Sequence, residues 1–258
     1  MDPATIVGLV VAFGAIIGSM IMEGGNPMTI VVPPALVLIF VGTTGACMAG
    51  MTMPGMIGSF KWLIAGFTAK KPDIDAVIEP LVRMAEKARR EGLLALESEM
   101  ESITDPFMKK GLQMAVDGTD PDDLYEILQA EIKAKKAGVA QGASFWNDAG
   151  GYSPTIGIIG TVIGLIHVLE NLSQPDKLGH LIAGAFVATL WGVLSANVMF
   201  LPWGKRVKFV GMAEVARMEL IVDGVLAIQA GANPRVVATK LKSKIIHPGP
   251  QAPAEEAA

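Results

Sequence analysis

Two threonines are the polar side chains best placed for chemistry in a sequence whose long apolar stretches hold few polar residues. Thr161 and Thr189 each lie near the middle of an uncharged stretch. A hydroxyl oxygen in such a place can be a ligand for a hard cation such as sodium. The same hydroxyl can instead bond to the backbone carbonyl one helical turn earlier, which is the usual role of threonine in a membrane helix. The residues alone leave both interpretations open.

These stretches lack the acidic or basic residue that a route for ions usually contains. No Asp, Glu, Lys or Arg lies deep within any of them. Ion and proton pathways use such groups although each costs about 2.5–3.5 kcal/mol at the centre of a membrane helix. Either the chain moves no ion, therefore, or a partner chain supplies the carboxylate. His167 is the one ionisable candidate, and because it lies near a stretch end we interpret it as structural or interfacial.

Four apolar stretches are long enough to cross a bilayer, which takes about 20 helical residues. The chain is 51% hydrophobic, with a mean hydropathy of +0.46. The sequence therefore predicts an all-α membrane protein with four transmembrane helices and a large helical insert between the second and the third. The four stretches are 4–22, 29–51, 153–169 and 181–201. Because Asp2 and Pro3 precede the first stretch in place of basic residues, we expect it to be a retained span.

The domain organisation follows from these stretches. We predict transmembrane helices 1 and 2 within residues 1–60 and a cytoplasmic helical insert over 61–148. Transmembrane helices 3 and 4 should lie within 149–204, followed by a cytoplasmic C-terminal helix over 205–247 and a disordered tail over 248–258. Of the 21 Lys and Arg residues, 12 lie in the insert and 8 follow the fourth stretch. The positive-inside rule therefore predicts a membrane protein whose insert and two termini are all cytoplasmic.

The insert shows helical periodicity and turn signals. Apolar residues recur at helical spacing from residue 77 to 88. Gly92 should break this helix before a second one over 93–101, and a third should begin near Asp105 and Pro106. Asp120 followed by Pro121 predicts the start of a longer helix that runs towards the third span. The residues of the first pattern are Val77, Ile78, Leu81, Met84, Ala85 and Ala88.

Small residues recur on one face of three spans. Such spacing lets another helix backbone approach closely, either within one subunit or between subunits. Three stripes in one small protein favour a tight assembly that includes helices from other chains. The stripes are Gly42, Ala46 and Gly50; Gly157, Gly160 and Gly164; and Gly184, Ala188, Gly192 and Ala196.

Several classes of function find no support in the sequence. The lone Cys47 cannot form an intramolecular disulfide, and the three histidines are scattered without metal-ligand spacing. The net charge of −4 says little about partners. We therefore predict that the protein is not an enzyme, holds no cofactor other than a transported ion and binds no nucleic acid.

Five segments resemble the MotA/PomA stator proteins of the bacterial flagellar motor, within the MotA/TolQ/ExbB superfamily. Each motif is moderately specific, and their shared order over roughly residues 1–245 is highly specific. The segments are Asp2–Gly8 (DPATIVG), Glu23–Gly25 (EGG), Ala88–Glu97 (ARREGLLALE), Ser153–Ile166 (SPTIGIIGTVIGLI) and Leu178–Gly192 (LGHLIAGAFVATLWG).

The resemblance implies an A-type subunit that acts in motility and chemotaxis. Family members form a pentamer around a dimer of a MotB/PomB-like subunit, whose membrane helix carries an essential aspartate. Ion flow past that aspartate drives torque on the rotor protein FliG. A multi-span subunit of this kind also contacts membrane lipid. A partner aspartate of this kind fits the carboxylate missing from these spans.

The resemblance also implies roles for particular residues. Pro154 and Pro202 match functional prolines at the ends of spans three and four, where a simple helix-end role is the alternative. Arg89 and Glu97 match the charged pair that contacts the rotor, the alternative being a solvated helix face. Glu131 matches a further acidic position.

The coupling ion is predicted to be sodium, with the proton as the alternative. The span-four threonine, here Thr189, occurs in both ion classes of the family, whereas the span-three threonine, here Thr161, is typical of sodium-type members. We therefore predict a transient sodium site at these two residues. A TolQ/ExbB-like energiser of outer-membrane processes is an alternative function, although such proteins have one span before their large loop. A channel acting alone should show its own polar ring, and none is visible.

Overall fold

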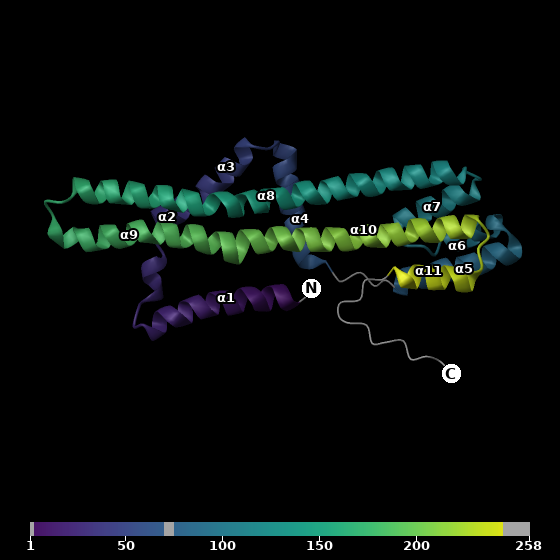
Figure 1. Ribbon diagram of the computed structural model, residues 1–258, viewed down its shortest axis with the longest axis horizontal. Helices are drawn as coiled ribbons and strands as arrows, with labels where there is room; N and C mark the ends of the chain where they lie inside the picture. Colours follow the sequence, from purple (N-terminus) through teal and green to yellow (C-terminus); the bar gives the residue numbers. More distant parts are fainter. Residues whose placement is uncertain (1–2, 70–74, 245–258) are drawn as a thin grey trace. The chain divides into compact units, whose positions relative to one another are not determined.

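The computed structural model describes residues 3–69 and 75–244, and all its regular elements in those ranges are helical (Figure 1). The chain divides into two compact units. The first comprises residues 1–71 and 137–212, and the second comprises 72–136 and 213–258. The second unit, called the polar unit below, is therefore shorter at both ends than the predicted insert 61–148. It also includes part of the C-terminal region.

Helix α1 (Pro3–Met22) is apolar around its whole circumference. None of its residues from Ala4 to Met22 is buried against the rest of the chain. Large side chains such as Val10 and Val11 are 66% and 63% exposed. A helix that is apolar on every side must find an apolar environment, so α1 has the character of a membrane span.

The second predicted span begins later than its apolar composition indicates. A short 3-10 helix covers Pro27–Ile30, and regular helix starts only with α2 (Pro33–Val37), which continues through a π-helical segment (Leu38–Gly42) into α3 (Thr43–Ala49). Pro33 holds the preceding Val32 in an extended conformation, because the residue before a proline avoids the helical region. The apolar helix therefore spans 33–49 rather than 29–51.

A further helix begins just after the predicted end of the second span. The Thr52 hydroxyl accepts a hydrogen bond from the amide of Gly55 at 3.3 Å and caps α4 (Met53–Thr68). Pro54 lies in the first turn, where its missing amide hydrogen costs nothing. The apolar composition of this segment continues that of the preceding stretch, so the sequence pattern does not separate α4 as a helix of its own.

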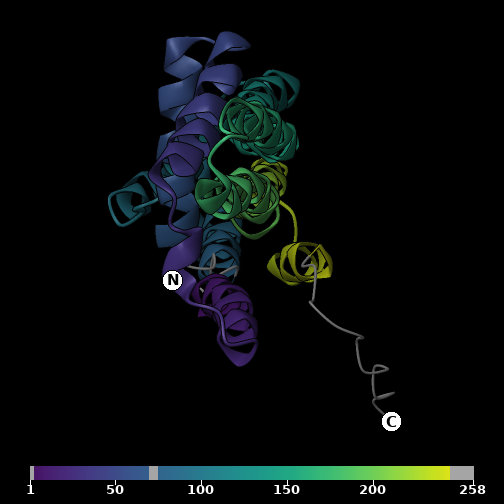
Figure 2. The same ribbon diagram turned by 90° about the vertical axis from the view of Figure 1, so that its left-hand side faces the viewer.

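Two long apolar helical runs lie side by side in the first unit (Figures 1 and 2). The first is the C-terminal part of α8 (Pro121–Glu170). The second is α9 (Pro175–Leu194), which continues through a π-helical segment (Ser195–Phe200) into α10 (Leu201–Gln229). In the described part of the chain, three helical stretches are long and apolar enough to cross a membrane, and they contain spans one, three and four.

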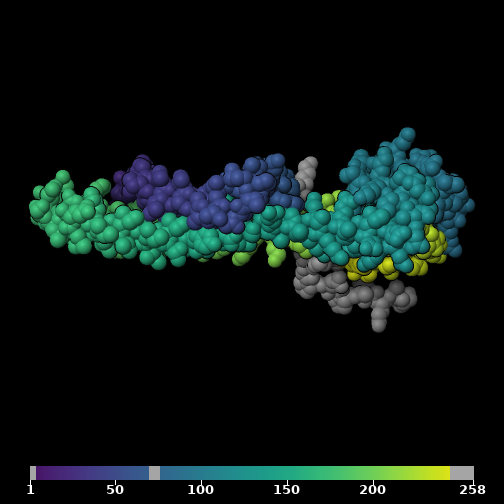
Figure 3. Space-filling view, turned by 90° about the horizontal axis from the view of Figure 1, so that it is seen from above, coloured from purple at the N-terminus to yellow at the C-terminus, as the bar shows by residue number. Residues whose placement is uncertain are grey.

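The second unit is a helical domain with a continuous apolar core. It contains α5 (Asp75–Glu91), a 3-10 turn (Leu93–Leu96), α6 (Glu97–Met100), α7 (Pro106–Val116), the first part of α8, the end of α10 and α11 (Pro234–Ser243). All six residues of the predicted pattern from 77 to 88 are buried in this core. Figure 3 shows the outer surface of the segments that enclose it. The predicted helix 93–101 is instead a 3-10 turn and a single α turn.

Helix boundaries in this unit follow their capping residues. The Asp105 carboxylate accepts hydrogen bonds from the amides of Phe107 and Met108 at 2.9 and 3.0 Å, which confirms the predicted start of α7. Asp120 accepts from the amide of Asp122 at 2.9 Å, and α8 begins at Pro121 as predicted. These caps satisfy amides that have no partner inside their own helix.

The predicted C-terminal helix 205–247 is divided in two. Helix α10 ends at Gln229, and Gly231 adopts a φ of 66°, which glycine reaches without steric cost. The Asn233 side chain then accepts from the amide of Arg235 at 3.0 Å and starts α11. The predicted disordered tail 248–258 lies outside the described residues.

Candidate functional site

Helices α8 and α9 approach each other at backbone distance along a stripe of small residues. A Cβ atom added at Gly157 would lie 3.0 Å from the Ala188 carbonyl oxygen. One added at Gly164 would lie 2.5 Å from the Ala185 Cβ. The stripe predicted on span three therefore packs within one chain against Ala188 and Gly192 of the span-four stripe, and no larger residue fits at Gly157 or Gly164 without a shift of the helices. A Cβ added at Gly184 meets nothing within 4 Å, so this member of the predicted stripe is outside the contact.

The close approach brings the two predicted threonines together. The hydroxyls of Thr161 and Thr189 are hydrogen-bonded to each other, and both side chains are half-buried. Each hydroxyl also lies 3.2 Å from the carbonyl oxygen of Gly157, and Thr161 lies 3.4 Å from that of Ala185. Thr161 therefore bonds to the backbone carbonyl one turn earlier, whereas Thr189 reaches the same carbonyl across the helix contact. Their role as cation ligands stays a prediction.

This oxygen cluster is chemically suited to a hard cation. It contains two hydroxyl and two carbonyl oxygens. Hard cations prefer such oxygen ligands to nitrogen or sulfur ligands. It holds no carboxylate of its own. Across the described residues, no group of three or more His, Cys, Asp or Glu side chains could hold a metal ion.

Pro154 lies inside α8, next to a buried polar contact. The hydroxyl of Ser153 lies 2.6 Å from that of Ser195 and donates to the Gly192 carbonyl at 2.9 Å. Both serines are fully buried. A Cβ added at Gly192 would lie 3.3 Å from the Pro154 Cα. Pro154 therefore sits at a tight contact between α8 and the end of α9.

Pro202 follows a local change of helical geometry. It is the second residue of α10, directly after the π-helical segment Ser195–Phe200. Proline has no amide hydrogen for the carbonyl four residues earlier, and π-helical turns are frequent at functional positions. The structure thus places Pro154 and Pro202 on neighbouring helices in different settings, one at the α8–α9 contact and the other in a groove beside α1.

His167 is exposed, and its contacts lie outside the oxygen cluster. Its Nδ1 atom lies 3.4 Å from a carboxylate oxygen of Glu170, and its side chain is 59% exposed. The Asn171 side chain donates to the His167 carbonyl at 2.8 Å. These contacts are local to the end of α8, and the structural or interfacial role of His167 stays a prediction.

Arg89 and Glu97 are both exposed and flank the tight turn after α5. Within the described residues, neither side chain forms an ion pair or a hydrogen bond. Gly92 turns the chain between them with a φ of 87°. The segment is held instead by Lys87, whose Nζ atom lies 3.1 Å from Glu99 and 2.9 Å from the Ser98 hydroxyl. The turn is thus fixed by neighbouring contacts, and two charges are left at the surface.

Glu131 has a different setting from this pair. Its carboxylate accepts a hydrogen bond from Lys110 at 2.8 Å, and the side chain is 42% exposed. The contact joins α7 to α8. Glu131 therefore has a structural partner, which Arg89 and Glu97 lack among the described residues.

Sequence reasoning missed the backbone carbonyls of the oxygen cluster and several polar contacts. The stripe of small residues was the signal that could have indicated these carbonyls, because helices that pack closely bring their backbone oxygens near the neighbouring helix. Nothing in the local sequence pairs Ser153 with Ser195, or Asp105 with Arg217, which form an ion pair across 112 positions. Such pairs depend on which helices become neighbours.

Comparison with known proteins agrees with these features. Residues 99–220 match the MotA/TolQ/ExbB proton channel family, and residues 6–92 match the motility protein A N-terminal family. Motility protein A of Bacillus subtilis is 35% identical over 244 residues, which cover 93% of this chain and 90% of the relative. None of these describes an enzyme.

Two solved structures are similar over nearly the whole chain. The structure of C. jejuni MotAB matches with a TM-score of 0.92 and 32% identity, covering 98% of this chain and 100% of that one. The flagellar MotAB stator complex from Bacillus subtilis matches with a TM-score of 0.85 and 34% identity, covering 92% and 93%. The chain belongs to the motility protein A family.

Proposed function

We propose that this chain is the A-type stator subunit of a bacterial flagellar motor and couples cation flow to torque together with a B-type subunit. Membership of the motility protein A family supports the stator role. The N-terminal family match and the apolar helices that precede the polar unit favour this function over a TolQ/ExbB-like energiser. The location that fits this family and its apolar helices is the inner membrane.

The oxygen cluster at Thr161 and Thr189 is the observation that carries the ion-coupling proposal. It combines hydroxyls and carbonyls at a half-buried helix contact. The uncharged stretches around it contain no Asp or Glu. Because a cation inside a membrane needs a compensating charge, a carboxylate from the single membrane helix of a MotB/PomB-like partner completes the proposed site.

Sodium is the proposed ion. A sodium ion must replace its hydration shell by several oxygen ligands, and the cluster offers such oxygens from two neighbouring helices. A proton needs only the titratable partner group. The proton remains the second candidate because the matching family is described as a proton channel family. The number of available oxygens favours sodium.

The remaining parts of the proposal concern assembly and torque. Five copies around a dimer of the B-type subunit would place five oxygen clusters near the partner helices. Arg89 and Glu97 supply exposed charges for contact with the rotor protein FliG. The polar unit and both termini are cytoplasmic in this scheme, and the outer helices contact membrane lipid.

The test is motor rotation against external sodium at fixed pH and membrane potential, in cells that carry this chain with its B-type partner. Rotation should rise with sodium and stop without it. Thr161→Ala should abolish sodium-driven rotation, and Thr161→Ser, which keeps the oxygen, should restore most of it. Rotation that is unchanged in sodium-free medium would overturn the sodium assignment in favour of the proton.

Thr155→Ala is the matched control. Thr155 lies on the same helix, and its hydroxyl donates to the Tyr152 carbonyl at 2.8 Å, outside the cluster. Its removal should leave the sodium response unchanged. If Thr155→Ala and Thr161→Ala reduce rotation equally, the effect belongs to the helix rather than to the oxygen cluster.

A further inference from the structure

A fully buried pair of serines joins α8 to the junction between α9 and α10. Ser153 and Ser195 are both 0% exposed, and their hydroxyl oxygens lie 2.6 Å apart. Either hydroxyl can reach the Gly192 carbonyl, Ser153 at 2.9 Å and Ser195 at 3.3 Å. Hydroxyls that bond across helices inside a membrane hold those helices together. The pair is therefore a polar contact between two spans.

The hydrogen atoms of the pair decide which bonds cross between the helices. Each hydroxyl has one hydrogen to donate. In the arrangement with the shorter bonds, Ser153 donates to the Gly192 carbonyl and Ser195 donates to Ser153, so both bonds cross. In the other arrangement, Ser195 donates to Gly192 in its own helical run, and only the bond between the hydroxyls crosses. The shorter distances favour two cross-helix bonds.

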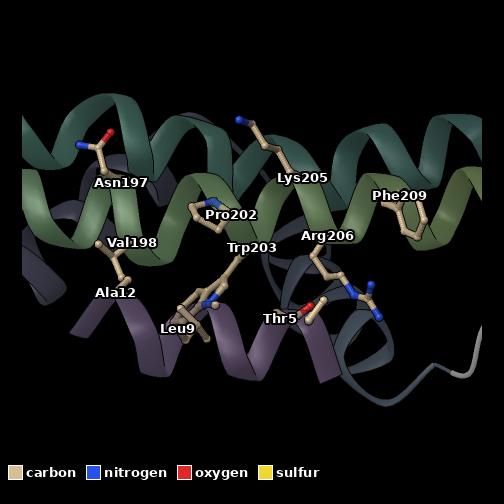
Figure 4. A pocket seen from close by; sticks show the side chains of 12 residues that line it. Thr5, Leu9, Ala12, Asn197, Val198, Pro202, Trp203, Lys205, Arg206 and Phe209 are labelled. Atoms are coloured by element: carbon tan, nitrogen blue, oxygen red, sulfur yellow. The ribbon is translucent and has the colours of Figure 1, made fainter. Parts of the chain in front are cut away.

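Each helix lacks an internal hydrogen bond close to this pair. Pro154 has no amide hydrogen for the carbonyl of Gly150, and Pro202 has none for the carbonyl of Val198. The segment Ser195–Phe200 is also π-helical, and both prolines and π-helical turns are common causes of bends in helices. In Figure 4, Val198 and Pro202 lie on this stretch beside the groove along α1. Both helices are therefore easier to bend here than in a regular helical turn.

Two glycines let these weakened turns pack directly against each other. A Cβ added at Gly150 would lie 2.5 Å from the side chain of Leu201, the residue before the second proline. A Cβ added at Gly192 would lie 2.7 Å from the Ser153 carbonyl oxygen and 3.3 Å from the Pro154 Cα. The two proline-containing turns are thus neighbours, although the prolines themselves have different surroundings.

The same contact reaches the oxygen cluster. The Gly157 carbonyl oxygen lies 3.2 Å from the hydroxyls of both Thr161 and Thr189. A Cβ added at Gly192 would lie 3.1 Å from the Gly157 Cα, and the Gly192 carbonyl accepts the hydrogen bond from Ser153. Each step from the proposed ion site to the serine pair is therefore a direct contact between neighbouring helices.

We propose that Ser153 and Ser195 are positioning residues that hold the two proline-containing turns together, so that a displacement of α8 at the ion site is passed on to α10. This inference rests on the proposed ion-coupling function. The serines act through the prolines and not as ion ligands, because both are fully buried. Without the cross-helix bonds the two turns bend independently, and part of the displacement is lost before it reaches α10.

The test is the rotation speed of tethered cells that carry this chain and its B-type partner, measured against external sodium, or against external pH if the wild-type motor ignores sodium. Ser195→Ala keeps the bond from Ser153 to Gly192 and should lower the maximal speed about threefold, the average effect of one hydrogen bond between membrane helices. Ser153→Ala removes both cross-helix bonds and should lower it further. The double variant should match Ser153→Ala, because it has no further bond to lose.

A second readout separates positioning from ion binding. The cation concentration at half-maximal speed should stay at the wild-type value in all three variants, because the oxygen cluster is unchanged. Ser153→Ala is also combined with Pro154→Ala. If the serine acts through the proline, the two losses of speed should not add. Demonstrated coupling of this kind, rather than proximity alone, is what a route between two sites requires.

Ser59→Ala is the matched control. Ser59 is also fully buried, and its hydroxyl donates to the Gly55 carbonyl in its own helix at 3.0 Å. It also lies 3.4 Å from the Gln141 carbonyl of α8, roughly three and a half helical turns from Pro154. Loss of this hydroxyl should leave the maximal speed unchanged.

Several results would overturn the inference. Wild-type speed in both single variants would show that the pair is not needed, and additive losses in the double variant would show that the serines act separately. A raised half-maximal cation concentration would place the effect at the ion site. An equal loss in Ser59→Ala would make it an effect of any buried serine.

Assembly and the wild-type motor are measured in parallel. Variants that disappear from the membrane, or that lose thermal stability as purified complexes in proportion to their speed, would make the role of the pair structural. Ser195→Ala keeps one cross-helix bond and decides the question if Ser153→Ala does not assemble. A wild-type motor that turns on neither cation would refute the proposed function and this inference together, whereas a working motor with normal serine variants refutes the inference alone.

Discussion

The two compact units differ in how much of their large apolar side chains they leave exposed. In the second unit, Leu112, Leu124 and Leu128 are completely inaccessible and form part of one core. The first unit has a smaller buried cluster that includes Phe145 and Trp146, but many of its large apolar side chains are half exposed, such as Ile158 and Val162 at 56% and 52%. Along the contact between α8 and α9, the close approach is made by glycine and alanine.

The difference indicates that the two units of the chain have different surroundings, water for the second unit and a bilayer for the first. In water, burial of apolar surface drives packing, so large side chains move inside. In a bilayer, the surroundings are as apolar as leucine, so helices associate through close backbone packing and hydrogen bonds. The contacts at Gly157, Gly164 and the Ser153–Ser195 pair are of this second kind. The comparison predicts which substitutions matter in each unit.

The largest effect on stability is expected in the core of the second unit. Leu128→Ala should destabilise it by about 2–5 kcal/mol, because it leaves a cavity in a packed interior. Ile127→Ala, one residue earlier and 44% exposed, should cost far less. Hydrogen exchange of residues 106–132 in the full-length complex in nanodiscs measures both. Equal effects would contradict the assignment of this unit to water.

A smaller but clear effect is expected where α8 meets α9. Gly164→Leu places a side chain where a Cβ already lies 2.5 Å from Ala185, and such overpacking costs about 1–3 kcal/mol. Gly151→Leu on the same helix meets nothing within 4 Å and should be tolerated. Thermal unfolding of the purified complex compares them. If both are tolerated, the close helix contact is not needed for assembly.

Replacing the prolines should weaken the coupling of ion flow to rotation, with little effect on the stability of the complex. Pro154→Ala and Pro202→Ala each restore an amide hydrogen inside a helix, so the complex should assemble normally while the motor turns more slowly. Pro175→Ala serves as the control, because Pro175 begins α9, where no amide hydrogen is needed. Rotation of tethered cells measures the speed. Normal torque in both variants would reject a mechanical role.

The smallest effect on stability is expected at the surface of the second unit. Arg89→Glu and Glu97→Arg should change stability by no more than about 0.5 kcal/mol, as surface substitutions without partners do. Both should reduce swimming if these charges contact the rotor. Arg90→Glu, which removes an exposed ion pair with Glu86 at 2.6 Å, is the neighbouring control. Loss of the protein from the membrane would make the residues structural instead.

Local patterns in the sequence predicted much of the fold. Helical spacing from Val77 to Ala88 identified the buried face of α5, and capping residues such as Asp105 placed helix starts. Composition identified the apolar stretches. These features depend on neighbours within a few residues, which is why they can be read without the structure.

The predictions missed two local boundary signals, and they could not reach contacts that depend on distant neighbours. Pro33 delayed the start of the second apolar helix, and Gly231 with Asn233 divided the C-terminal helix, although both signals are local ones. Thr161 and Thr189 were expected only to lie near the middle of their two apolar stretches. Their shared contact with the Gly157 carbonyl required the register between α8 and α9, which no local pattern encodes.

The exposure of α1 also bears on how the protein responds to the thickness of its bilayer. Its 19 apolar residues from Ala4 to Met22 extend about 28 Å as a helix, close to the hydrocarbon thickness of about 30 Å. A helix of matched length stands nearly upright, and a thinner bilayer makes it tilt. Because α1 has few contacts of its own to resist tilting, hydrophobic mismatch should move it before any other span.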